Sequence, residues 1–167
     1  MDSTTLLTIV IGVAVVGGLY YVLTNKSAGK TEPVLPAAPK STALQLQAYE
    51  RLALLADRMA IPGLISRTAA EGLTAREMQF LLTKNLRDEF DYNITQQIYV
   101  SAEVWNAVKS LKEKNLLLIN QVAATLAPQA QGMDLNRALL DFLVTDKQAN
   151  LPELVSQAIS FEAKKLL

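Results

Sequence analysis

The tightest group of side chains that could do chemistry in this sequence is Asp88, Glu89 and Asp91. On a helix, Asp88 and Asp91 share a face, which paired carboxylates would need to bind a metal through oxygen or to act in acid–base catalysis. Lys84 and Arg87, however, precede these two residues by four positions, which is the spacing of surface ion pairs. The sequence therefore favours a solvated, ion-paired helix face, and a carboxylate-dependent enzyme stays the weaker alternative.

The remaining residue types exclude many other chemistries. The chain contains no cysteine and no histidine, so disulfides, Cys/His zinc sites and imidazole-based triads are ruled out. The seven glycines are scattered, and the phosphate-binding patterns GxGxxG and GxxxxGK[ST] do not occur. We therefore expect a protein that is not an enzyme and that uses no cofactor and no metal.

Charge also limits the partners. The chain has 16 basic and 16 acidic side chains, and from residue 43 onward there are 13 basic and 14 acidic ones, a net charge of −1. The densest basic group, Lys109, Lys112 and Lys114, is interrupted by Glu113 and is typical of a solvated helix face. Nucleic-acid binding needs a clustered basic surface, so we expect no nucleic-acid partner.

A second group combines amides with aromatic rings: Gln96, Gln97, Tyr99 and the only tryptophan, Trp105. Aromatic side chains with polar atoms are enriched at protein interfaces, and they also occur in cores where their polar atoms hydrogen-bond at helix ends. Both interpretations stay open, the core being favoured. These four residues are the candidates for an interaction site.

The element that should position everything else is an apolar run at the N-terminus. Leu6 to Leu23 contains no charge, and a helix over residues 4–24 would rise about 31 Å, close to the thickness of the bilayer hydrocarbon. A cleaved signal ending near Ala28-Gly29 is the alternative, but the run is long and ends in bulky aromatic residues. We expect residues 1–24 to be a retained transmembrane anchor in the lipid bilayer.

The flanking charges predict the orientation of this anchor. Lys26, Lys30 and Lys40 follow the run, and no lysine or arginine precedes it. Because basic residues beside a span tend to stay in the cytoplasm, we expect a single-pass protein of a bacterial inner membrane, with its N-terminus outside and its C-terminal domain cytoplasmic.

Small residues on the anchor could support helix packing. Thr8 and Gly12 lie four residues apart, and so do Ala14 and Gly18. Such small-xxx-small spacings let two helix backbones approach closely in lipid, although glycine and alanine are also common in spans for other reasons.

Residues 25–42 contain three prolines and few apolar side chains, which predicts a flexible Pro/Ala linker. Residues 43–167 are long enough for one domain with its own core. Thr42 with Gln45, Thr74 with Glu77, and Ser101 are typical helix-start residues, and Pro62-Gly63 predicts the end of the first helix, before a connecting segment over residues 64–72. Only Ile98 to Val100 has an extended pattern. The four-residue run from Leu116 to Ile119 is apolar on all sides and predicts the most buried element.

These signals predict an all-α fold with one N-terminal transmembrane helix, the linker, and a small soluble bundle of four to five helices. The expected helices start near residues 43, 75, 102, 134 and 151.

The sequence also resembles an uncharacterised family of bacterial proteins with one N-terminal span and a short helical cytoplasmic domain. The resemblance covers about residues 44–125, in the segments Leu46 to Leu52, Glu89-Phe90, Asn93, Gln96 to Tyr99, and Trp105. It implies the layout of anchor and domain, but no activity and no site residue.

Together these features predict a non-enzymatic, membrane-anchored scaffold or accessory subunit of a larger inner-membrane assembly. Its partners would be other membrane or cytoplasmic proteins. A self-associating, homo-oligomeric membrane protein is the alternative.

Overall fold

The structure, a computed structural model, describes residues 41–68, 70–145 and 150–167. The predicted anchor, with Thr8, Gly12, Ala14 and Gly18, and most of the predicted linker lie outside these residues. Within the described ranges, none of the helices combines the length and the apolar character needed to cross a bilayer.

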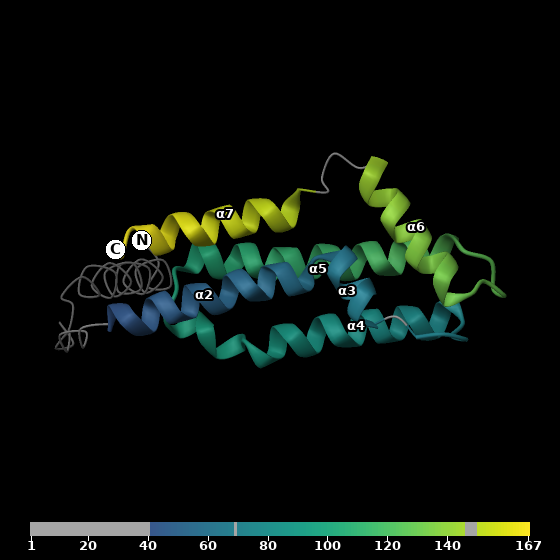
Figure 1. The fold of residues 1–167 in the computed structure, drawn as a ribbon, viewed down its shortest axis with the longest axis horizontal. Coiled ribbons are helices and arrows are strands. Elements are labelled where there is room, and N and C mark those ends of the chain that lie inside the picture. Colours follow the sequence, from purple (N-terminus) through teal and green to yellow (C-terminus); the bar gives the residue numbers. More distant parts are fainter. Residues whose placement is uncertain (1–40, 69, 146–149) are drawn as a thin grey trace, which may run out of the picture. The chain divides into compact units, whose positions relative to one another are not determined.

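The described residues form an all-α fold, as the sequence predicts, with six α-helices and one 3-10 helix (Figure 1). In chain order these elements are α2 (Thr42–Met59), α3 (Ile61–Thr68), α4 (Ala75–Tyr92), η1 (Ile94–Ile98), α5 (Ala102–Thr125), α6 (Gly132–Thr145) and α7 (Leu151–Lys164). α2, α4, α5 and α7 run along the length of the bundle, and α6 is inclined to them at the end where α5 finishes.

The additional helix, α3, corrects the prediction of a connecting segment over residues 64–72. α2 ends at Met59, where Ala60 adopts an extended conformation, and a new helix starts at once. Pro62 lies in the first turn of α3. Backbone N–H groups in the first turn have no acceptor within the helix, so proline, which has no N–H, costs no hydrogen bond there. Leu64 and Ile65 are buried, so their packing stabilises a helix that the Pro-Gly pair alone does not favour.

Two of the three predicted helix-start signals are confirmed. The Thr74–Glu77 capping box is present: Glu77 N donates to Thr74 Oγ1 at 3.3 Å, and Thr74 N donates to Glu77 Oε2 at 2.9 Å. Ser101 Oγ accepts from Val104 N at 3.3 Å and caps α5 as expected. The predicted box at Thr42 is wrong, because Thr42 is already helical.

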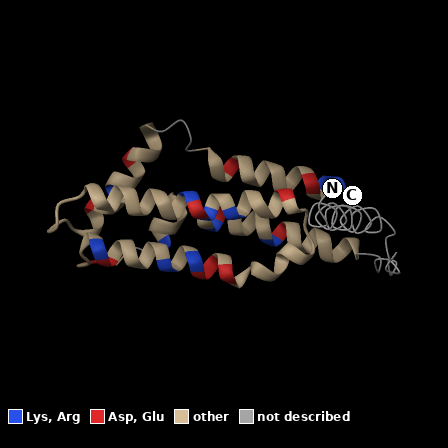
Figure 2. Ribbon diagram, turned by 180° about the vertical axis from the view of Figure 1, so that it is seen from behind, with Lys and Arg blue, Asp and Glu red and all other residues tan. Residues whose placement is uncertain are grey.

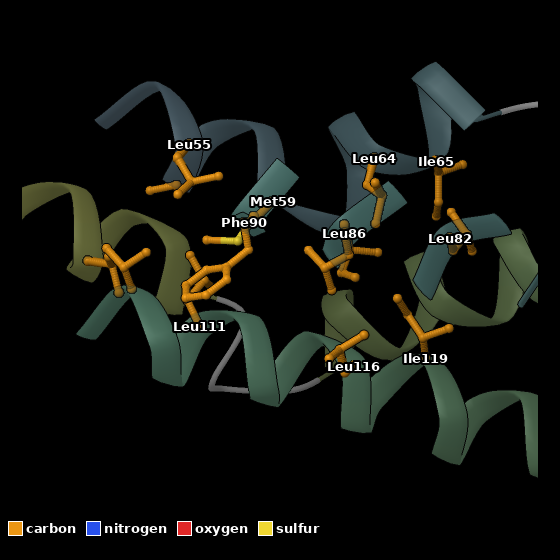
Figure 3. Packing of buried hydrophobic residues seen from close by; sticks show 14 of the residues in the cluster. Leu55, Met59, Leu64, Ile65, Leu82, Leu86, Phe90, Leu111, Leu116 and Ile119 are labelled. Carbon is orange, nitrogen blue, oxygen red and sulfur yellow. The ribbon is translucent and has the colours of Figure 1, made fainter. Parts of the chain in front are cut away.

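The core is formed by buried side chains from all six α-helices. Figure 3 shows its centre, where apolar residues of α2 and α3 face those of α4 and α5. The labelled residues there are Leu55, Met59, Leu64, Ile65, Leu82, Leu86, Phe90, Leu111, Leu116 and Ile119. A buried amide joins two of these helices, because Asn115 Nδ2 donates to Met59 O at 2.8 Å.

The run from Leu116 to Ile119 is only partly buried, which corrects the expectation of an element enclosed on all sides. Leu116 and Ile119 are buried and Leu118 is half-buried, but Leu117 is 55% exposed. α5 therefore has one side without a complete cover.

The loop before α6 is fixed to the start of α4. Gly132 N donates to Leu73 O at 2.7 Å, and Ala75 N donates to Ala130 O at 2.9 Å. A Cβ at Gly132 would lie 3.2 Å from Leu73 O and 3.1 Å from Met78 Cβ, so a side chain here would push these neighbours away by a few tenths of an ångström.

Candidate functional site

The amide–aromatic group lies at the junction of α4, η1 and α5. Ile94 to Ile98 form the 3-10 helix η1, so the predicted extended segment at Ile98 to Val100 is wrong. Three extended residues with no neighbouring strand could not hydrogen-bond their backbone N–H and C=O groups. A 3-10 helical turn forms these hydrogen bonds within the segment itself.

The structure divides this group between core and surface. Trp105 is 9% exposed, and its ring lies 5.1 Å from the ring of Phe90 between centroids. Gln96 is also buried, while Tyr99 is half-buried and Gln97 is exposed. The side chains of Trp105 and Gln96 are therefore buried within the junction of α4, η1 and α5, whereas Gln97 is exposed and accessible to a partner.

One residue that holds this junction together was missed. Tyr49 of α2 accepts a hydrogen bond through its hydroxyl from Ser101 N at 3.1 Å. The two residues lie 52 positions apart, so no local pattern connects them. The start of α5 is thereby fixed to the first half of α2.

The carboxylate group does not converge on one point. Asp88 is exposed and pairs with Lys84 at 2.5 Å, as the four-residue spacing predicts. Glu89 lies instead against α2 and pairs with Arg58. Among the residues that the structure describes, no group of acidic side chains is arranged to hold a metal ion.

The Arg58–Glu89 pair links three helices. Arg58 Nε donates to Glu89 Oε2 at 2.8 Å, a second guanidinium N–H reaches Oε1, and Arg67 of α3 donates to the carbonyl oxygen of Arg58. The hydrogen bond from Arg58 lowers the pKa of Glu89, and the same bond raises the pKa of Arg58. Two cavities beside this pair, of about 480 and 350 Å³, share Arg58, Glu89 and Tyr92 in their linings. Since the charges are paired, we interpret this cluster as a structural link.

A third cavity, of about 600 Å³, is a groove along the incompletely covered side of α5. α5 contributes Lys114, Leu117, Leu118 and Gln121, a spacing that places all four on one helix face. The other walls come from the start of α3, the end of α6 and the start of α7. Their side chains are Ala60, Ile61, Pro62, Phe142, Leu143, Asn150, Leu151, Pro152 and Glu153, with Asn115 from α5 as a further lining residue. We call this cavity the α5 groove.

α2 begins and α7 finishes at the same end of the bundle, which we call the proximal end (Figure 1). Exposed apolar side chains occur in these elements and in η1, as they do elsewhere in the described residues, for example at Phe80, Met133 and Val144. Those of the first group are Leu44, Ile94, Ile98, Phe161 and, beyond α7, Leu167. Figure 2 shows basic and acidic segments mixed along the helices, so charge does not single out either region.

Comparison with known proteins places the chain among proteins whose role has not been assigned. Residues 1–166 match a family of unknown function, DUF7935. The chain belongs to this family. A stretch of 39 residues, 23% of the chain, is 49% identical to the "Uncharacterized protein YaaL" of Bacillus subtilis (strain 168).

That stretch covers 53% of the YaaL protein, so the chain spans about half the length of this relative. No solved structure matches the chain. The resemblance to an uncharacterised family is thus confirmed at that level. Neither comparison adds a site residue, and the α5 groove remains the best-defined candidate surface.

Proposed function

We propose that this member of the DUF7935 family is a non-enzymatic accessory or scaffold subunit of a bacterial inner-membrane assembly, and that it binds an amphipathic helix of a partner protein in the α5 groove. A single span over residues 4–24 would hold it in the membrane, with the N-terminus outside and the helical domain in the cytoplasm. The observation that carries the proposal is the groove itself.

The lining of the α5 groove supports a helix as its ligand. Leu117 and Leu118 lie at the centre of the α5 stripe, and Phe142 and Leu143 face the same cavity from α6. Apolar grooves between helices accept amphipathic helices, whose apolar residues recur at three- and four-residue spacings. A volume of about 600 Å³ accommodates several such side chains.

The chemistry of the chain supports a binding role over catalysis. The sequence lacks cysteine and histidine, and two neighbouring carboxylates of α4 are paired with different cations, Asp88 with Lys84 of the same helix and Glu89 with Arg58 of α2. The membrane location is supported by the uncharged run of residues 6–23 and by the lysines that follow it.

Photo-crosslinking in native membranes tests the groove. We would place a photoreactive phenylalanine analogue at Phe142 of the full chain, and at Phe80, an exposed residue of α4 outside the groove, as the control. We expect the Phe142 probe to attach to one defined segment of another protein, with an amphipathic pattern, and the Phe80 probe to miss that segment.

A companion substitution makes this result specific. Leu117→Asp should remove the crosslink while leaving the thermal unfolding curve nearly unchanged, because this side chain is mostly exposed. Adducts at multiples of 18.2 kDa would instead support the self-associating alternative. An unaltered crosslink in Leu117→Asp would contradict the groove as the binding site.

The absence of cysteine allows a direct test of topology. A single cysteine at Ser3 should react with a membrane-impermeant maleimide in intact spheroplasts, whereas one at Lys164 should react only after lysis. The opposite pattern would reverse the proposed orientation, and extraction of the full chain by alkaline carbonate would exclude the span.

A further inference from the structure

We infer that the outer face of α6 is a dimerisation surface, which pairs antiparallel with the same face of a second copy of the chain about a twofold axis. This surface lies on a different side of α6 from the α5 groove. It therefore adds a second interaction to the proposed partner helix and does not replace it.

The outer face of α6 carries a stripe of exposed apolar side chains. Met133, Leu140 and Val144 are 73%, 40% and 88% exposed. They follow one another at spacings of seven and four residues, so all three lie on one face of a single helix. The buried residues Leu135 and Leu139 lie on the other side, where α6 packs against α3, α4 and α5 (Figure 1). We call the exposed set the α6 stripe.

Exposed apolar side chains on the other helices are arranged differently. In α2 and in α4 the two large ones are separated by ten and twelve residues, which turns them about 80° and about 120° from each other around the helix. In α7, Leu154 and Phe161 share a face, but Lys165 Nζ lies 4.4 Å from the centre of the Phe161 ring and covers part of it. Among the described helices, only α6 therefore has uncovered apolar side chains along three turns of one face.

Two charges beside the α6 stripe indicate what covers it. Arg137 and Asp141 are exposed and lie on the same flank of the stripe. Within the described ranges, neither side chain takes part in an ion pair, whereas Asp134 on this flank accepts a hydrogen bond from Gln131 N at 2.9 Å. A face that carries an unpaired cation and an unpaired anion, four residues apart, can be its own complement.

Only the antiparallel direction makes the two faces complementary. A twofold axis through the middle of the stripe places Met133 of one copy opposite Val144 of the second copy. Arg137 of one copy and Asp141 of the other then lie on the same flank, within about 1.5 Å of each other along the helix axis. A parallel pair would instead put the two charged flanks on opposite sides of the interface. The antiparallel contact forms two identical ion pairs and closes the assembly at two copies.

The size of this face sets the strength that we expect. A helix of 14 residues is about 21 Å long, so its face buries less than the roughly 800 Å² per partner that is typical of stable complexes. We therefore expect a weak, reversible dimer, which crosslinking can trap.

The α5 groove stays open in this dimer. Phe142, which lines the groove, lies two residues from both Leu140 and Val144, so it is turned about 160° away from them around the helix. A crosslinking probe at Phe142 therefore does not report on the dimer, and the two proposals can fail separately.

Disulfide crosslinking of the purified full chain, which has no cysteine of its own, tests the direction of pairing. Met133→Cys combined with Val144→Cys places the thiols opposite each other in the antiparallel pair, with Cα atoms about 5–6 Å apart, a distance that a disulfide can bridge. We expect an adduct of twice the 18.2 kDa chain mass. Its yield should be at least about fivefold higher than with either single change, because two identical positions lie about 16 Å apart along the axis.

A matched pair on α4 is the control. Phe80→Cys combined with Asp91→Cys also places two exposed thiols eleven residues apart on one helix, and this variant should stay monomeric. Equal yields from the single and the double α6 variants would overturn the antiparallel pairing. Absence of the adduct would assign the α6 stripe to another occupant and overturn the dimer.

Charge exchange between two copies tests the roles of Arg137 and Asp141. In the chain with both α6 cysteines, Arg137→Glu leaves only acidic groups on the flank and Asp141→Arg leaves only basic ones. Each variant alone should give at least about threefold less adduct, because like charges then meet across the axis. Both positions are exposed, so the thermal unfolding curve should stay nearly unchanged.

A mixture of these two variants makes the test specific for contact between copies. Both ion pairs are restored only in an adduct that contains one chain of each kind, and a tag on one chain identifies this adduct by its mobility. We expect it to exceed both homodimers. Pairing within a single helix cannot produce this rescue, since each chain keeps like charges. Adducts in random proportions would overturn the proposed pairing of Arg137 with Asp141.

Discussion

At the proximal end of the bundle, exposed apolar side chains lie on helix termini above a tightly packed junction, whereas along α5 they line an open groove. The junction is fixed by the Tyr49–Ser101 hydrogen bond and by the contact between Phe90 and Trp105. The groove has no comparable closure, and Leu117 stays mostly exposed within it.

This difference leaves the groove as the better-defined surface for a partner. A concave apolar stripe suits a single amphipathic helix, which is the ligand we propose for the α5 groove.

The largest expected effect on stability comes from removing the Trp105 side chain from the junction of α4, η1 and α5. Trp105→Ala should lower the free energy of unfolding by about 3–5 kcal/mol, because it leaves a cavity beside Phe90. Leu117→Ala in the groove should change it by no more than about 0.5 kcal/mol. Urea denaturation followed by far-UV circular dichroism measures both, and equal losses would contradict the contrast between a packed junction and an open groove.

The support of α6, which forms one wall of the groove, should be the next most sensitive point. Gly132→Ala places a Cβ against a backbone oxygen and should cost about 1–3 kcal/mol. Gly63→Ala in α3 is the matched control, because its Cβ would lie 3.2 Å from the end of the exposed Arg67 side chain and 3.8 Å, an ordinary contact distance, from Asp57 O, and helix propensity should stabilise it by about 0.5 kcal/mol. Thermal melts compare the two, and a stable Gly132→Ala would show that α6 can shift freely.

The Arg58–Glu89 ion pair should have a smaller effect on the free energy of unfolding, and this effect should depend on pH. Glu89→Gln should cost about 0.5–1 kcal/mol at neutral pH, a value reduced for the partial exposure of both side chains. Because the folded-state pKa of Glu89 is lowered, its contribution is present above the unfolded-state pKa of about 4.3 and is lost as the pH falls through the folded value. Melting temperatures of the two proteins should therefore converge once the pH falls below the folded-state pKa of Glu89, and a constant difference would argue against the pair.

The exposed carboxylates of α4 should matter least. Asp88→Asn removes a surface pair with Lys84 and should cost about 0.3–0.5 kcal/mol. Asp91→Asn should behave similarly, and neither change should alter crosslinking through the α5 groove. Loss of a measurable hydrolytic activity in both variants would instead support the enzyme alternative.

Much of the fold was predictable because its signals are local. The Thr74–Glu77 box and the Ser101 cap each involve residues three positions apart, so the sequence contains both partners. The four-residue spacing of Leu82 and Leu86 is typical of one face of a helix, and both residues are fully enclosed. The Lys84–Asp88 pair follows from the same short-range geometry.

The missed features depend on contacts between distant segments. Pro62-Gly63 indicates a helix end, but the burial of Leu64 and Ile65 extends the chain into α3. The run from Leu116 to Ile119 contains no polar residue that would show which side is open. The groove beside Leu117 exists only because α3, α6 and α7 border α5 without covering it.

The sequence by itself determined that the described residues fold mainly into helices, and that histidine and cysteine chemistry is absent. Helix caps and periodicity act over a few residues, so they can be read along the chain. Only the tertiary structure decided which apolar side chains stay exposed, and that Leu117 and Phe142 line the α5 groove. Exposure depends on what packs against a residue from elsewhere in the chain, and one-dimensional patterns do not contain that information.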